Sequence, residues 1–387
     1  MKTQGTNGRF WCDSDLVRPC FIMFHYYLMS VCCGDWFTLF LSTTGQILFV
    51  GRISTSLDDR ILSRSPQHYR ELEKIVSMGA GGGFGLFVDD IGRVWGIGCN
   101  ASAQLGLRTM KPLVKRPTRV PGLNKIIQVS CGQQHSACLD EEGFVWHIGR
   151  SCEGINVHSQ PYKIQGLENI QTVNCGRNHI LCLSISGEVW SYGNNSYFLL
   201  GNTDISLIAL PIPERIEKIS SGEFHCLALD ILGFVWVFGS NEHNRLGFEI
   251  EDTPEQPPLV VPNPERMKLE QIRQVECGPD FSACINQSGN VYVFGNNQWK
   301  KLGLHHEAAV QKPTLLPFPV PIQMISLGPR HSIAIDIENQ FWGFGANHNY
   351  TLALGHNKDC TGIMKLPTEL TQQVFVTRNK SARKVVS

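Results

Sequence analysis

One pattern recurs seven times along this 387-residue chain. Each copy has a glycine and a histidine or phenylalanine three residues later, and all but the last have a second glycine eleven residues after the first. A Val-Trp or similar pair and a third glycine follow. The copies begin 44 to 56 residues apart, at Gly34, Gly81, Gly132, Gly176, Gly222, Gly278 and Gly328. Self-similarity at this period predicts an array of equivalent structural units.

Each copy predicts four short strands. In the sixth copy, three strand-like segments (272–275, 281–285 and 291–294) are separated by turn residues. The second glycine stands where a tight hairpin needs positive φ, and only the seventh copy has Asn339 there. A Pro-x-x-apolar segment follows in several copies, and proline favours the outer edge of a sheet. Four antiparallel strands repeated seven times predict an all-β fold, a seven-bladed β-propeller.

The repeat resembles that of the regulator of chromosome condensation family. The motifs that carry the resemblance are Gly132-x-x-His135, Val145-Trp146 and Gln104-Leu105-Gly106, with equivalents in other copies. The resemblance covers about residues 25 to 370 and implies a seven-bladed propeller. Two other propeller repeats fit less well. No Trp-Asp dipeptide closes any copy, and the double glycine of kelch repeats does not recur.

The repeats predict one propeller domain over residues 25–372. Residues 1–24 form an N-terminal segment that can contribute closing strands, and residues 373–387 are expected to be a mobile tail. Pro19–Ile22 and Pro367–Leu370 both resemble the fourth strand of a copy. We therefore expect one of these two terminal segments to close the ring by completing a blade.

Charge and hydropathy narrow the classes of partner. Lys and Arg number 34, and Asp and Glu also number 34, so the formal net charge is zero. A protein whose main partner is nucleic acid needs an excess of positive charge, so this class is disfavoured. The most apolar stretch, residues 20–33, is shorter than a membrane-spanning helix. The sequence thus predicts no membrane association, and we expect a monomer.

The fourteen cysteines follow the repeat rather than a ligand pattern. Seven of them occupy two recurring positions, namely Cys33, Cys131, Cys175, Cys277, Cys138, Cys182 and Cys284. Small apolar residues fill these positions in other copies, which indicates buried thiols. No Cys-x-x-Cys pair exists, so no metal site is expected. Unpaired thiols imply a reducing compartment, hence an intracellular location in the cytoplasm, the nucleus or both.

The histidines and tryptophans also recur by position. The histidine position holds His135, His179, His225 and His331, and phenylalanine in the other copies; the Val-Trp position holds Trp95, Trp146, Trp190, Trp236 and Trp342. A position that accepts phenylalanine is a packing position, so we interpret both sets as structural core.

The glycine run at 79–85 lacks the Lys-Ser/Thr ending of a phosphate loop. We expect no catalytic residue and no cofactor.

Two long segments are not explained by the repeat. Residues 248–270 contain the acidic side chains Glu249, Glu251, Asp252 and Glu255 among several prolines, and residues 52–74 form the second segment. Loops on a rigid scaffold are where binding residues concentrate, so the four acids are the candidate partner-binding residues.

The sequence therefore favours a protein-interaction scaffold without chemistry of its own, which presents blade loops to a partner protein. The resemblance implies an alternative, a guanine-nucleotide exchange factor for a Ran-like small GTPase. That activity uses an inserted hairpin wedge and acidic loop residues, and no wedge can be matched here residue by residue. A chromatin-associated or nucleic-acid binder is a second alternative, against which the neutral net charge weighs.

Overall fold

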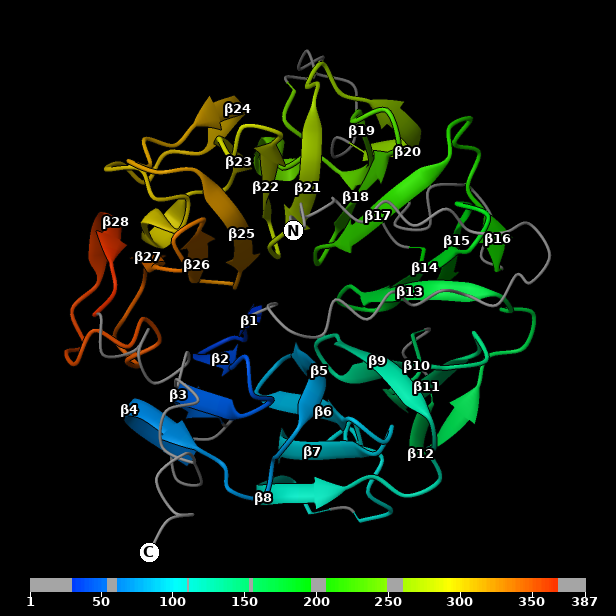
Figure 1. Cartoon of the computed structure of the whole chain (residues 1–387). Coiled ribbons are helices and arrows are strands. Elements are labelled where there is room, and N and C mark those ends of the chain that lie inside the picture. The colour runs from blue at the N-terminus through cyan, green and yellow to red at the C-terminus, as the bar shows by residue number, and fades with distance from the viewer. Residues whose placement is uncertain are drawn as a thin grey trace, which may run out of the picture.

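The computed structural model describes residues 30–53, 61–109, 111–152, 156–195, 207–248 and 260–367. Within these residues, seven four-stranded antiparallel sheets surround a common axis as the blades of a propeller (Figure 1). The all-β, seven-bladed fold predicted from the repeat is confirmed. Apart from the strands, the described chain has only two single-turn 3-10 helices, Glu242–Asn244 and Gln298–Lys300.

Each blade is built from four strands that are consecutive in the chain. Blades 1 to 4 comprise β1–β4 (Ser30–Cys33, Phe37–Leu41, Ile47–Ile53, Ile61–His68), β5–β8 (Ile75–Ala80, Phe84–Asp89, Val94–Cys99, Leu113–Arg119), β9–β12 (Ile126–Cys131, His135–Asp140, Val145–Arg150, Val157–Lys163) and β13–β16 (Ile170–Cys175, His179–Ser184, Val189–Gly193, Ile208–Ala209). Blades 5 to 7 comprise β17–β20 (Ile216–Ser221, His225–Asp230, Val235–Ser240, Val260–Arg266), β21–β24 (Ile272–Cys277, Phe281–Asn286, Val291–Gly295, Val310–Leu315) and β25–β28 (Ile322–Leu327, His331–Asp336, Phe341–Gly345, Cys360–Lys365).

Ring closure differs from the prediction of a terminal closing strand. Blades 1 and 7 each already contain four consecutive strands in the described chain. They meet through side chains instead: the His331 ring contacts Thr38 Oγ1 at 2.8 Å, and Thr38 Oγ1 donates to the Thr351 carbonyl at 2.8 Å. Pro367 lies just after β28, while Pro19–Ile22 and residues 368–370 fall outside the described residues. The last interface thus uses the same histidine position as the interfaces within the ring.

The second strand of each blade is buried along nearly its whole length because both faces are covered by neighbouring blades. Such strands have apolar runs rather than an alternation of apolar and polar residues. Each fourth strand is the exposed edge, and several carry the predicted proline, such as Pro117 in β8 and Pro313 in β24. The strand starts before the proline, so the edge strands are longer than the Pro-x-x-apolar pattern indicated.

The Leu-Gly motif is explained by contacts between blades. Gly303 has a φ of +79°, and a Cβ there would lie 3.2 Å from Cδ2 of Phe344 in the next blade. The glycine both adopts a left-handed turn and leaves room for the neighbouring ring. Leu302 before it is fully buried. The motif therefore allows one blade to pack closely against the next.

Candidate partner-binding site

The four acidic residues selected from the sequence, Glu249, Glu251, Asp252 and Glu255, lie outside the described residues. The two long segments that contain no repeat motif are only partly loops. Residues 260–266 form β20, and residues 61–68 form β4, each the edge strand of its blade. The expectation of insertions over 248–270 and 52–74 was wrong for these portions, because an edge strand tolerates the prolines that suggested a loop.

The repeated histidines lie between blades. The His135 ring contacts the Gly176 carbonyl at 3.2 Å, His179 contacts Cys226 Sγ at 3.2 Å, and His225 contacts Ser282 Oγ at 2.8 Å. Each partner belongs to the following blade. Loss of hydration on burial lowers the pKa of His135 to about 4 and that of His179 to about 3. These rings are therefore neutral at pH 7.

The repeated tryptophans lie on the third strands and are half-buried, whereas the residue before each of them, valine in four blades and Phe341 in the seventh, is buried. In four blades the indole N–H donates to an aspartate at the hairpin turn, as in the bond from Trp236 Nε1 to Asp230 Oδ2 at 2.9 Å. The other oxygen of Asp230 accepts backbone N–H groups of Leu232 and Phe234 at 2.9 Å. The same arrangement joins Asp89 to Trp95, Asp140 to Trp146 and Asp336 to Trp342.

The first strands of the blades surround a central cavity of about 290 Å³. Glu276 lies in this channel, and burial raises the pKa of its carboxyl to about 8 although the Leu327 backbone N–H opposes the shift. Burial also raises the pKa of the Cys32 thiol to about 12. A thiol with a raised pKa is a poor nucleophile. The described channel residues thus supply no activated nucleophile.

One mouth of the channel is lined by the residues that follow the first glycine of each copy. The seven equivalent backbone positions vary in residue type, and three of them carry the charged side chains Asp35, Arg177 and Glu223. Arg177 Nη1 donates to Glu223 Oε2 at 3.0 Å. Burial and the nearby Glu223 raise the pKa of Asp35 to about 6, while Arg330 and Arg177 oppose the shift. The mouth therefore carries charges of both signs that interact across blades.

A second cavity of about 320 Å³ lies on the same side, over blades 5, 6 and 7. Two basic side chains are almost fully buried in its wall, Arg245 at 2% and Lys301 at 3% exposure. Lys301 Nζ lies 2.5 Å from Asp280 Oδ1, and Arg245 Nη2 lies 3.1 Å from Glu242 Oε2. Buried charges persist when they are paired in this way. The two ion pairs hold these charged side chains in place in the wall of the cavity.

An aromatic cluster with one arginine borders the second cavity, which Trp299 and Arg330 line. The Arg330 guanidinium lies 3.7 Å from the centre of the Trp36 indole and 5.6 Å from that of Trp299. The His348 ring is 5.1 Å from Trp36 and 5.8 Å from Trp299. Trp299 is 36% exposed, so its ring remains available to a partner. We call these four residues the Trp36 cluster.

Sequence reasoning missed the Trp36 cluster because its members come from three blades. A signal was present, however. Trp36 and Trp299 do not occupy the Val-Trp position that holds five of the eight tryptophans. A large aromatic residue that a repeat does not require is a candidate for binding.

One group of buried potential metal ligands occurs in the described chain, formed by His135, His147 and Cys152. It lies inside blade 3 and takes no part in lining the cavity over blades 5 to 7. No helix in the described part of the chain is long and apolar enough to cross a membrane.

Comparisons with family models and with known proteins agree on the family to which this chain is similar. A family model described as an RCC1-like domain matches residues 55–387. The Xenopus laevis protein named regulator of chromosome condensation is 26% identical over 331 residues, which are 81% of this chain and 70% of that protein. Human "probable E3 ubiquitin-protein ligase HERC3" is 35% identical over 130 residues, or 32% of this chain. The matched segments make up only 12–14% of the length of HERC3 and of two Nek9 kinases.

Solved structures share the fold. Prp20p from Saccharomyces cerevisiae superimposes with a TM-score of 0.75 at 22% identity, covering 93% of this chain and 92% of that one. Prp20p itself is described as having binding properties to Gsp1p and histones. Human WBSCR16 gives a TM-score of 0.69 at 22% identity, over 79% of this chain and 85% of that one.

Proposed function

The chain belongs to the RCC1-like domain family, and we propose that within this family it acts as a non-catalytic scaffold that binds a partner protein at the channel mouth. The Trp36 cluster carries this proposal. Tryptophan and arginine are the residue types that contribute most binding free energy at protein interfaces. In this cluster they are stacked and partly exposed, so little side-chain freedom remains to be lost on binding.

The charges around the Trp36 cluster favour a protein over a polyanion. The two cavities are lined by five acidic and four basic residues, namely Asp35, Glu223, Glu242, Glu276, Asp280, Arg177, Arg245, Lys301 and Arg330. A phosphate backbone requires a predominance of positive charge. Mixed charge instead suits a protein surface with complementary acids and bases. This balance weighs against the chromatin or nucleic-acid alternative, although binding properties to histones are described for Prp20p.

Substituting Arg330 or Trp299 with alanine should reduce recovery of the partner protein at least tenfold. Each change removes an anchor of the kind whose loss costs about 2 kcal/mol or more at an interface. The measurement is affinity capture of the full chain from cells, with quantitative mass spectrometry of the proteins recovered by wild type and each variant.

The matched control is Ile231→Ala. Ile231 is 56% exposed at the turn between β18 and β19, which lies on the opposite face of the ring from the channel mouth. Its substitution should leave recovery unchanged. Partners that survive Arg330→Ala and Trp299→Ala but are lost with Ile231→Ala would place binding on the other face.

A second candidate is exchange activity on a Ran-like small GTPase, favoured by the similarity to regulator of chromosome condensation over 81% of this chain. We propose that Glu249, Glu251, Asp252 and Glu255 would serve this activity. Their segment continues the connection that carries Glu242 and Arg245 beside the second cavity.

If the chain is a scaffold without exchange activity, adding the full chain to a panel of Ran-like GTPases should not increase the rate at which they release fluorescent GDP. Acceleration that disappears on changing all four acids to their amides (Glu249→Gln, Glu251→Gln, Asp252→Asn, Glu255→Gln) would establish the exchange factor instead. The control changes two exposed acids, Glu141→Gln and Glu142→Gln, at the hairpin turn of blade 3.

An intracellular location is also proposed. The described cysteines form no disulfide, and most of them are buried. Thiols persist in reducing compartments.

A further inference from the structure

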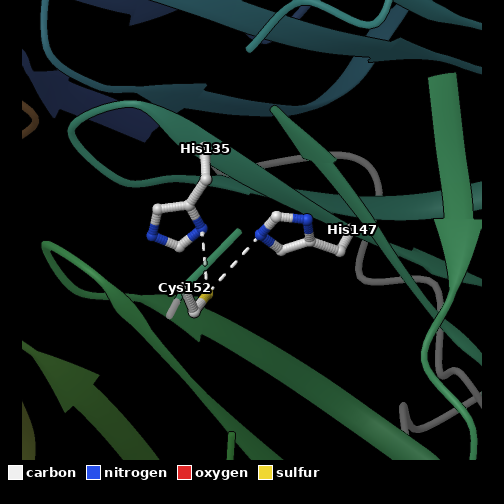
Figure 2. Close-up of side chains that lie close together, drawn as sticks. All are labelled: His135, His147 and Cys152. Atoms are coloured by element: carbon white, nitrogen blue, oxygen red, sulfur yellow. Dashed lines mark hydrogen bonds between the residues drawn. The ribbon is translucent and has the colours of Figure 1, made fainter. Parts of the chain in front are cut away.

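Three side chains of blade 3 converge in its interior. His135 comes from β10, His147 from β11, and Cys152 from the connection that leads to β12 (Figure 2). Cys152 Sγ lies 3.8 Å from His135 Nδ1 and 3.5 Å from His147 Nε2. All three are buried, with exposures of 1%, 0% and 1%. Figure 2 shows the two nitrogen atoms facing each other with the sulfur beside them.

The repeat requires only one of these residues. His135 occupies the recurring histidine position, whereas the position of His147 holds Val237 in blade 5 and Val293 in blade 6. Cys152 lies against Gly193, the third glycine of the next copy. Gln104 and Lys301 have the equivalent contact with a third glycine in other blades. The meeting of two imidazoles and a thiol therefore cannot be attributed to the blade architecture.

The donor atoms are oriented as metal ligands. His135 Nε2 contacts the Gly176 carbonyl at 3.2 Å, which places the proton on Nε2 and leaves the lone pair of Nδ1 directed toward Cys152. A hydrogen bond of this kind on the distal nitrogen is the usual way to orient a metal-binding histidine. The imidazole planes are 14° apart and their centres are separated by 5.3 Å.

The distances between donor atoms also match coordination. Metal–nitrogen bonds of about 2.05 Å and metal–sulfur bonds of about 2.3 Å separate N and S by about 3.6 Å at a tetrahedral angle and about 3.8 Å at a trigonal angle. The observed separations are 3.5 and 3.8 Å. The three donor atoms all lie within 4.8 Å of one another.

The His147 ring is poorly satisfied, as is that of His179, whose Nδ1 also lacks a hydrogen-bond partner among the described residues and whose Nε2 contacts Cys226 Sγ. The His147 ring is fully buried, and among the described residues its Nδ1 atom has no hydrogen-bond partner. Its Nε2 atom contacts the thiol of Cys152, which is a weak hydrogen-bonding group. Burying a polar ring with so little compensation is unfavourable. A metal bond at Nε2 would offset that cost.

We propose that blade 3 holds a buried site for one thiophilic metal ion, coordinated by His135 Nδ1, His147 Nε2 and Cys152 Sγ. Thiolate and imidazole ligands suit Cu⁺ and Zn²⁺. On binding, the Cys152 proton is released to solvent and the sulfur binds the metal as thiolate. This site is independent of the partner proposed for the channel mouth.

The surroundings favour Cu⁺. Cys152 packs in an apolar cluster with side chains such as Ala137, Ile164 and Ile180. With two neutral imidazoles, Cu⁺ and one thiolate make a neutral complex, whereas Zn²⁺ would leave an unbalanced positive charge. An unbalanced charge in an apolar interior is strongly disfavoured.

The test uses the full chain, stripped of metal and kept reduced under anaerobic conditions. It is titrated with Cu⁺ against a chromophoric Cu⁺ chelator, and separately with Zn²⁺. We expect one Cu⁺ per chain, and an X-ray absorption spectrum that fits one sulfur and two nitrogen ligands. Cu⁺ should also raise the melting temperature, because a ligand that binds only the folded state stabilises it.

His147→Val and Cys152→Ser should each reduce Cu⁺ affinity at least tenfold and abolish the rise in melting temperature. Valine is the residue of two equivalent positions, so the first variant should fold, and circular dichroism checks both. The matched control is Cys182→Ala, which removes a buried thiol of the same apolar cluster at a position where Ala228 and Ala334 stand in other blades. It should bind Cu⁺ like the wild type.

Two results would overturn the site: no metal retained by the wild type, or equal binding by the wild type, His147→Val and Cys152→Ser, which would place the metal on other thiols. Preference for Zn²⁺ over Cu⁺ with the same dependence on the two variants would overturn the choice of a monovalent ion. Partner capture is measured separately, so either proposal can fail alone.

Discussion

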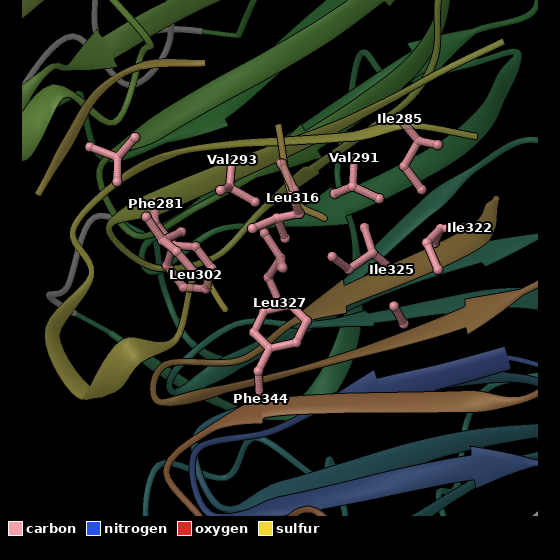
Figure 3. Packing of buried hydrophobic residues seen from close by; sticks show 13 residues of the cluster. Phe281, Ile285, Val291, Val293, Leu302, Leu316, Ile322, Ile325, Leu327 and Phe344 are labelled. Atoms are coloured by element: carbon pink, nitrogen blue, oxygen red, sulfur yellow. The ribbon is translucent and has the colours of Figure 1, made fainter. Parts of the chain in front are cut away.

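Replacing Phe344 with alanine should lower the free energy of unfolding by about 3–5 kcal/mol, the usual cost of deleting a buried aromatic ring. Phe344 lies on β27 with 0% exposure, and it packs in one cluster with Leu302 and Phe281 of blade 6 (Figure 3). The alanine would leave a cavity at the interface of two blades. Both blades are rigid sheets, so the space cannot easily close. Urea unfolding followed by circular dichroism measures the change.

The control for this prediction is Leu315→Ala on β24. Leu315 is 52% exposed, so the substitution should change the free energy of unfolding by less than about 0.5 kcal/mol. A loss below about 1 kcal/mol for Phe344→Ala would mean that the Leu-Gly motif does not seat a tightly packed blade interface.

Replacing Asp280 with alanine should cost about 3 kcal/mol, because it leaves the Lys301 ammonium buried without its counter-ion. Lys301 is 3% exposed, and Asp280 Oδ1 lies 2.5 Å from its Nζ atom. Nζ also donates to the Pro329 carbonyl at 3.4 Å and lies 5.0 Å from the centre of the Phe281 ring. The cost falls at the low end of the range for broken buried ion pairs because the Asp280 side chain is itself 26% exposed. Urea unfolding again provides the measurement.

A double-mutant cycle separates the ion pair from packing. Asp280→Ala combined with Lys301→Met should recover stability to within about 1 kcal/mol of the wild type, because methionine needs no counter-ion. The exposed pair of Lys125 and Glu141 serves as control, and Glu141→Ala should change stability by less than about 1 kcal/mol. Equal losses for Asp280→Ala and for the double variant would contradict a role for the unpaired ammonium.

The number and type of the blades could be predicted because they depend on local signals. Hairpin glycines and proline edges specify turns and strands within one copy, and seven copies specify the ring. Closure could not be predicted in the same way. The terminal proline segments resembled edge strands, but blade 7 joins blade 1 through side chains, among them Phe40 packed on Phe341 and the bond between His331 and Thr38. That bond links positions far apart in the chain, which no local pattern connects.

The candidate sites were harder to predict for the same reason. Trp36, Trp299 and Arg330 lie on three blades. The only sign of them in the sequence was that Trp36 and Trp299 are among the three tryptophans outside the repeated position. The metal ligands are close in the sequence, but not in a familiar ligand spacing. His147 would ordinarily be taken as one more strand residue, and Cys152 as a loop residue.

The sequence by itself determined the seven-bladed ring and the structural origin of seven cysteines, four histidines and five tryptophans. A repeat fixes what is the same in every blade, and those shared residues satisfy the same local backbone and packing demands each time. Only the tertiary structure decided where the differences between blades meet. The propeller brings one variable position from each blade to the channel mouth, and it folds His147 and Cys152 onto His135. A binding site at one place on the ring must use side chains that differ between blades, because residues repeated in every blade give every part of the ring the same surface.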